Sequence, residues 1–117
     1  MKTSIGSKSR LSVGIAFLVA VLNILNSCTK ANDPGLNEVF IQNSNFSPST
    51  ITVVANTAIT WMNKDGMSHT VTSDTGNELN SGNIPANETW SHTFTAAGTY
   101  PYHCTIHPAM KATVKVN

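Results

Sequence analysis

The sequence is poor in the residues that would support several large classes of protein. Only 11% of its 117 residues are charged, and no basic run is interleaved with aromatic residues. No nucleic-acid partner is expected, because such proteins carry a basic patch or stripe. Two cysteines cannot supply a disulfide framework. The length leaves room for one domain.

Beyond Cys28 the sequence also lacks apolar residues spaced three and four apart, the pattern of an amphipathic helix. Short stretches of period-two alternation occur instead, separated by Gly, Asn, Asp and Pro. They predict an all-β fold, a Greek-key sandwich or barrel of about seven to eight strands, with a long polar loop over 74–88. The expected strands are 38–42, 49–55, 57–63, 68–73, 89–95, 96–104 and 112–116.

The first 27 residues differ in composition from the rest. Three basic residues and no acidic residue precede an apolar run over 11–25. This is the layout of a secretory signal peptide, and the run is shorter than the roughly 20 residues of a transmembrane anchor, the alternative. We therefore expect a signal peptide over 1–27, a flexible tether over 28–37 and a folded domain over 38–117. Beyond the leader, four lysines against six acidic residues give a formal charge of −2.

The sequence "LNSC", which ends at Cys28, resembles a bacterial lipobox. The resemblance implies that Cys28 is acylated and tethers an exported protein to a membrane in the periplasm or cell envelope. Asn26 departs from the usual pattern, in which that position is small or β-branched. An ordinary signal peptide, cleaved a few residues to either side, is the alternative.

The segment "YHCTIHPAM" brings several metal-binding residue types close together near residue 104. Cys104 ends a predicted strand, and the two residues after it allow a turn that returns His107 to its side. Pro108 stiffens the path to Met110. His69 would have to reach the same place from another strand, which the sequence permits but does not require. We select these four residues, His69, Cys104, His107 and Met110, as candidate ligands.

The other histidines have simpler interpretations. Tyr100, Tyr102 and Cys104 share one face of their strand, so His103 is expected to point outward. His92 lies between two aromatic residues on its strand and is expected to be packed or at an edge, with its nitrogens bonded locally. A disulfide between Cys28 and Cys104 is a less favoured alternative, because it would consume the thiol of the candidate site.

The donor set favours one metal over others. A thiolate and a thioether are soft donors and two imidazoles are borderline, which together favour copper over calcium, magnesium or manganese. Zinc is the main competitor, but its structural sites use Cys and His and rarely a thioether. A sandwich without any metal, in which the four residues coincide by chance, is a further alternative.

The chain from about Val39 to Val116 resembles the cupredoxin family, close to its plastocyanin and amicyanin branch. The resemblance rests on "FSPSTITV", "ITWMNKDGMSHTVT", "SGNI", "TFTAAGTYPYHCTIHPAM" and "ATVKV", which occur in family order. Cys, two residues, His, two residues, Met is the short ligand loop of the amicyanin type. The resemblance implies that His69, Cys104, His107 and Met110 hold one copper ion.

The function implied by the resemblance is that of a type 1 (blue) copper protein, a monomeric one-electron carrier and not an enzyme. Transient redox partners would dock near His107, whose edge is surrounded by apolar residues such as Pro108. The alternative is a periplasmic protein that binds or transports copper without transferring electrons. Two positions depart from the family, Thr70 where many members have Asn and Ala112 where many have Gly.

Overall fold

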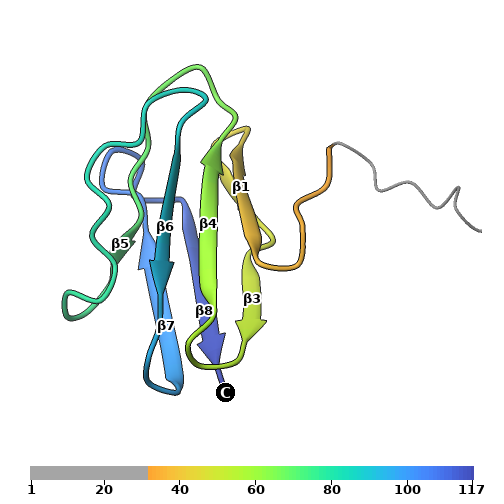
Figure 1. Ribbon diagram of the computed structural model, residues 1–117. Helices are drawn as coiled ribbons and strands as arrows, with labels where there is room; N and C mark the ends of the chain where they lie inside the picture. Colours follow the sequence, from red (N-terminus) through yellow and green to blue (C-terminus); the bar gives the residue numbers. More distant parts are fainter. Residues whose placement is uncertain (1–31) are drawn as a thin grey trace, which may run out of the picture. The chain divides into compact units, whose positions relative to one another are not determined.

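Two four-stranded sheets form the folded part of the chain in a computed structural model, which describes residues 32–117 (Figure 1). The described residues include no helix, and so none long and apolar enough to cross a membrane. The strands are β1 (Glu38–Gln42), β2 (Asn45–Ser47), β3 (Thr50–Val53), β4 (Ala58–Asn63), β5 (Thr72–Ser73), β6 (Thr89–Thr93), β7 (Gly98–His103) and β8 (Lys111–Val116). The predicted all-β class is thus confirmed, whereas the predicted leader and Cys28 lie outside the described residues.

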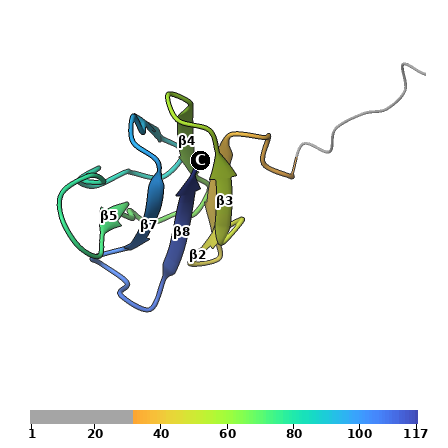
Figure 2. The ribbon, with the colours of Figure 1, turned by 90° about the horizontal axis from the view of Figure 1, so that it is seen from below.

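The strand order places segments from both ends of the domain next to each other. One sheet has the order β2-β1-β4-β6 and the other the order β3-β8-β7-β5. Strands β1 and β4 are parallel, and so are β3 and β8, whereas the remaining neighbours are antiparallel. Figure 2 shows β8 between β3 and β7. The sheets therefore depend on contacts between residues far apart in the sequence.

A tight turn joins β1 to the short strand β2. Asn43 and Ser44 form this turn with φ angles of 54° and 55°, and Gln42 pairs with Asn45 across it. Positive φ at both central residues is typical of two-residue hairpins. The sequence patterns did not predict β2, because it contributes only Phe46 to the core. The turn becomes important below, because it contacts the candidate site.

The core lies between the sheets and follows the predicted alternation. Ile59 and Trp61 of β4 are fully buried, and Ile51 and Val53 of β3 are each 6% exposed. Burial of such side chains is the main driving force for folding. The sheets are also joined by a buried polar contact, in which Trp61 Nε1 donates a hydrogen bond to the Tyr102 hydroxyl over 3.0 Å.

One predicted strand is wrong over most of its length. Of residues 68–73, only Thr72 and Ser73 form a strand, β5, paired with β7. His69 instead makes an isolated bridge to Ile84, with backbone hydrogen bonds of 3.2 and 2.8 Å. The long loop over 74–88, which was predicted, thus folds back and pairs with the segment before β5. His69 and Val71 are both fully buried, as their shared face predicted.

Candidate metal centre

The loop between β7 and β8 holds three of the four candidate ligands. His103 and Lys111 pair across the base of this loop. Inside it, the Met110 carbonyl accepts a hydrogen bond from the Cys104 amide over 3.1 Å, and the His107 carbonyl accepts one from the Met110 amide over 2.9 Å. The loop is thus closed by its own backbone hydrogen bonds, with Cys104 at its start and His107 within it. This agrees with the tight turn expected from the spacing.

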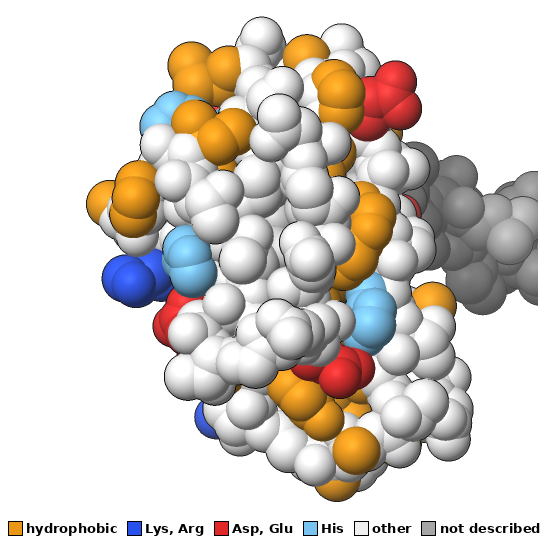
Figure 3. Space-filling model, turned by 90° about the vertical axis from the view of Figure 1, so that its left-hand side faces the viewer, with side chains coloured by type: hydrophobic (Ala, Val, Ile, Leu, Met, Phe, Trp, Pro, Cys, Tyr) orange, Lys and Arg blue, Asp and Glu red, His pale blue; other side chains and the backbone are white. Residues whose placement is uncertain are grey.

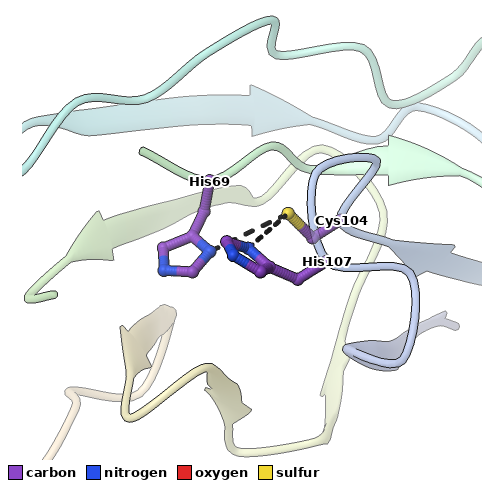
Figure 4. Close-up of side chains that lie close together, drawn as sticks. All are labelled: His69, Cys104 and His107. Atoms are coloured by element: carbon purple, nitrogen blue, oxygen red, sulfur yellow. Dashed lines mark hydrogen bonds between the residues drawn. The ribbon is translucent and has the colours of Figure 1, made fainter. Parts of the chain in front are cut away.

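His69 approaches the same place from the segment that precedes β5. Its bridge to Ile84 fixes its backbone, and its side chain is fully buried. Figure 4 shows the Cys104 sulfur beside both rings, with His107 on the same loop as Cys104 and His69 on a different segment. The chain therefore gathers donors that are 35 residues apart in sequence.

The distances within this cluster suit a single metal ion. Cys104 Sγ lies 3.8 Å from His69 Nδ1 and 3.9 Å from His107 Nδ1, and the three donor atoms all lie within 4.8 Å of one another. Bond lengths of about 2.3 Å to sulfur and about 2.0 Å to nitrogen would separate the two by about 3.7 Å in a trigonal plane and about 3.5 Å in a tetrahedron. The observed separations are within a few tenths of an ångström of both values, so the two donor pairs could bind one ion.

Met110, the fourth candidate ligand, lies at the end of the same loop. Its side chain is 4% exposed and belongs to the same buried core as Cys104. Its backbone bonds to both Cys104 and His107. The structure thus brings three candidate ligands together and buries the fourth on the same short loop.

The remaining two histidines lie outside the cluster, as expected. His103 Nδ1 lies 2.6 Å from an Asp74 carboxylate oxygen, and His92 Nε2 lies 2.8 Å from one of Glu78. His92 also stacks on Trp90 with ring centroids 5.7 Å apart. Figure 3 shows histidine side chains beside acidic side chains on this face of the molecule. Among the described residues, only His69 and His107 are left for a metal.

Hydrogen bonds from Thr70 secure the cysteine and its loop. The Thr70 amide donates to Cys104 Sγ over 3.3 Å, and its hydroxyl accepts the Thr105 amide over 2.8 Å. The same hydroxyl lies 3.0 and 3.1 Å from the hydroxyls of Thr72 and Thr105. The departure from Asn at this position therefore leaves the ligand loop bonded, through a cluster of three hydroxyl groups.

Sequence reasoning missed Asp65, which contacts a candidate ligand directly. An Asp65 carboxylate oxygen lies 2.8 Å from His69 Nε2, and the carboxylate is 15% exposed. Burial by itself raises the pKa of Asp65, but hydrogen bonds from the Ser44 and Asn43 amides, together with His69, outweigh it and hold this pKa below its usual range. The only signal was its position four residues before His69, which also suits an ordinary turn residue.

His107 is the candidate ligand whose ring borders on the surface. It is half-buried, whereas His69 and Cys104 are fully buried. Near it in sequence, Pro108 and Ala109 are exposed and Ile106 is 45% exposed. The loop thus presents apolar surface beside one imidazole.

Comparison with known proteins links this geometry to one family. A family model described as a cupredoxin-like domain matches residues 14–116. Amicyanin-alpha of Methylorubrum extorquens is 35% identical over 86 residues, covering 70% of this chain and 72% of the relative. Plastocyanin of Scenedesmus fuscus is 32% identical over 83 residues, covering 61% and 85%. A solved structure of an amicyanin mutant in its Cu(I) form has a TM-score of 0.62 and 32% identity, and the match covers 68% of this chain and 80% of that one.

Proposed function

The chain belongs to the cupredoxin family, and from this premise we propose that it is a type 1 copper protein that carries one electron at a time between redox partners. The four proposed ligands of the single ion are His69, Cys104, His107 and Met110. The observation that carries the proposal is the buried cluster of one sulfur and two imidazole nitrogens at 3.8 and 3.9 Å.

The donor set fits copper better than zinc. Two His, one Cys and a weak thioether are the donor types of a blue-copper centre, and His69, His107, Cys104 and Met110 would supply them here. A bound copper ion supplies a couple between two oxidation states that differ by one electron. The other two histidines, His92 and His103, lie outside the cluster and are paired with Glu78 and Asp74, which supports one ion rather than a multicopper enzyme.

The protein's contribution is to hold the donors still. Cys104 is fixed by the Thr70 amide and by the Met110 carbonyl, and His69 is fixed by its bridge to Ile84. Close-packed interiors resist deformation. Both oxidation states would therefore meet nearly the same ligand geometry, which keeps the structural change that accompanies electron transfer small.

We place the docking surface for partners around the His107 ring. Its apolar surroundings include Ile106 and Pro108, and Met67, from the loop before His69, is 52% exposed. Weak, small interfaces are typical of redox partners. A transient partner that meets this surface would bring its own redox centre close to the half-buried ligand.

Family membership and the leader-like N-terminus support an exported protein. Within that frame we propose that Cys28 is acylated and tethers the domain to a membrane of the cell envelope through the segment over 28–37. Intact mass spectrometry of the protein from a lipoprotein-processing bacterial host tests this. A mature chain that begins at Cys28 with added acyl mass is expected, and an unmodified N-terminus at another residue would contradict it.

Copper binding by the purified domain tests the main proposal. Addition of Cu²⁺ is expected to give an intense blue charge-transfer band that is lost in Cys104→Ser and in His107→Asn. His103→Asn is the matched control, since this histidine adjoins Cys104 but is bonded to Asp74, and it should retain the band. A colourless wild-type complex would contradict the proposal and favour zinc or copper transport. Reversible one-electron cycling by voltammetry then distinguishes a carrier from a store.

A further inference from the structure

Asp65 lies at the meeting point of three segments of the chain. It follows the end of β4, and its carboxylate accepts the Asn43 amide at Oδ1 over 2.7 Å and the Ser44 amide at Oδ2 over 2.9 Å. The same Oδ2 lies 2.8 Å from His69 Nε2. One carboxylate therefore joins the β1–β2 turn, 22 residues earlier in the sequence, to a candidate ligand.

The turn is built to bind a carboxylate. Asn43 and Ser44 both have positive φ, and their consecutive amide groups both donate to the Asp65 carboxylate. Backbone amides arranged in this way form an anion-binding site. Positive φ at both positions is also what the centre of a two-residue hairpin of this type requires. The shape of this turn and the position of Asp65 thus support each other.

Asp65 is itself held in place by a buried side chain. Its amide donates to Asn63 Oδ1 over 2.9 Å, and Asn63 is fully buried at the end of β4. Asn63 Nδ2 in turn donates to the Met67 and Ile84 carbonyls over 2.8 and 2.9 Å. Ile84 is the residue that bridges His69. The backbone and the ring of His69 are therefore positioned through one connected network.

The contact has a direct chemical consequence for the ring. A carboxylate can only accept hydrogen bonds, and a neutral imidazole carries a single N–H. Nε2 must therefore carry the proton, which leaves the lone pair of Nδ1 facing Cys104 Sγ at 3.8 Å. Partners of this kind fix the orientation of metal-binding imidazoles.

We propose that Asp65 is a positioning residue that couples the β1–β2 turn to His69 and presents its Nδ1 atom to the metal before the metal arrives. This inference rests on the proposed function, because it takes His69 as a ligand. It goes further in assigning roles to Asp65 and to the turn at Asn43 and Ser44. These residues lie outside the ligand loop altogether.

The first test begins with the metal-free wild-type protein, so its measurement on the His69 ring does not depend on copper chemistry. Nitrogen-15 NMR of the His69 ring is expected to show a proton on Nε2 that exchanges slowly with water because it is bonded to Asp65. The Asn43 and Ser44 amide protons should be shifted downfield and should move again when Cu⁺ is added. A rapidly exchanging ring proton, or turn amides that do not respond to Cu⁺, would overturn the proposal.

The second test compares two carboxylates that each face a histidine. Asp65→Asn is expected to weaken copper binding by about 10-fold or more, because loss of such a partner typically costs 10 to 100-fold. Asp74→Asn removes the same charge beside His103. It should change copper affinity by less than about 2-fold, because His103 is not a proposed ligand and only the partners of ligands affect metal binding in this way. Asp65→Glu, which keeps the charge, should recover part of the affinity. Equal losses in the two Asn variants would overturn the proposal.

The two proposals fail in different ways. A wild-type protein that stays colourless with Cu²⁺ would contradict the proposed function. The NMR result on the metal-free ring would still decide whether Asp65 orients His69.

Discussion

The Thr70 amide donates a hydrogen bond to the Cys104 sulfur, and the Thr70 hydroxyl accepts one from the amide of Thr105, the residue that follows Cys104. Thr70, which follows the candidate ligand His69, thus fixes both the sulfur atom of Cys104 and the backbone directly after it. Thr70 is only 4% exposed, so its own atoms in both contacts are shielded from bulk water.

Removal of the Thr70 hydroxyl is expected to destabilise the ligand loop. Thr70→Val keeps the shape but removes the acceptor of the part-buried Thr105 amide, which is expected to cost about 1 kcal/mol. Urea unfolding of the metal-free protein measures the loss. Thr52→Val, at an exposed position of β3, is the matched control and should change stability by less than about 0.5 kcal/mol. Similar losses in both variants would contradict the assigned role.

Tyr102 is expected to make the domain less stable at high pH. Burial raises the pKa of Tyr102 well above its usual value of 10.0, although the hydrogen bond from Trp61 partly opposes this. Above pH 10 the unfolded chain loses a proton that the folded chain keeps, so stability falls by up to about 1.4 kcal/mol per pH unit. Tyr102→Phe should remove this contribution. Identical slopes for the two proteins between pH 10 and 11 would contradict the prediction.

Asp65 is expected to contribute in the opposite pH range. Hydrogen bonds hold its pKa below 3.8 in the folded protein despite the effect of burial. Its contribution to stability is therefore fully present above the unfolded pKa of about 4 and is lost as pH falls through the folded value. The stability difference between wild type and Asp65→Asn should shrink over that interval, measured by denaturant unfolding. A difference that stays constant down to pH 2 would rule this out.

Asn63 is expected to be among the most sensitive polar positions. Its fully buried side-chain amide makes three hydrogen bonds, to Asp65, Met67 and Ile84. Asn63→Leu should cost about 2–5 kcal/mol, since buried backbone groups lose their partners. Asn45→Ala, which removes one exposed hydrogen bond, should cost less than about 0.5 kcal/mol. Thermal unfolding of the three proteins checks the ranking.

A charge placed beside His107 is expected to slow electron transfer. Ile106→Glu puts a carboxylate into the proposed docking surface. This should lower the electron self-exchange rate of the copper-loaded protein by about 10-fold, which corresponds to about 1.4 kcal/mol of free energy for the encounter. Val54→Glu is the control, because Val54 is 63% exposed and follows β3, at the end of the sandwich away from the ligand loop. NMR line broadening in mixtures of the two oxidation states measures the rate. Equal slowing by both variants would argue against docking at His107.

Much of the fold could be predicted because alternation along a strand is a local property. Ile59 and Trp61 share a buried face for this reason, and so do Ile51 and Val53. The Cys104, His107 and Met110 spacing is also local, so their common loop could be read directly. In contrast, β2 is too short to show a period, and its existence depends on packing of Phe46 against Tyr102.

The contacts that His69 makes with distant residues could not be predicted from the sequence in the same way. The pairing of His69 with Ile84 replaced most of a predicted strand, because the long loop competes with β7 for that segment. Asp65 looked like a turn residue, and its contact with His69 exists only once the β1–β2 turn packs beside it. No local pattern records that three segments meet at one carboxylate.

The parallel pairing of β3 with β8 also has a consequence for how the molecule comes into being on the ribosome. Strand β8 lies between β3 and β7, so that sheet stays incomplete during translation until residues 111–116 have emerged. Such distant pairings make folding slow compared with proteins built from neighbouring segments. Because the loop over 104–110 is synthesised immediately before β8, the nascent chain cannot hold the assembled site that we propose until residues 111–116 have emerged, and metal loading has to follow their synthesis.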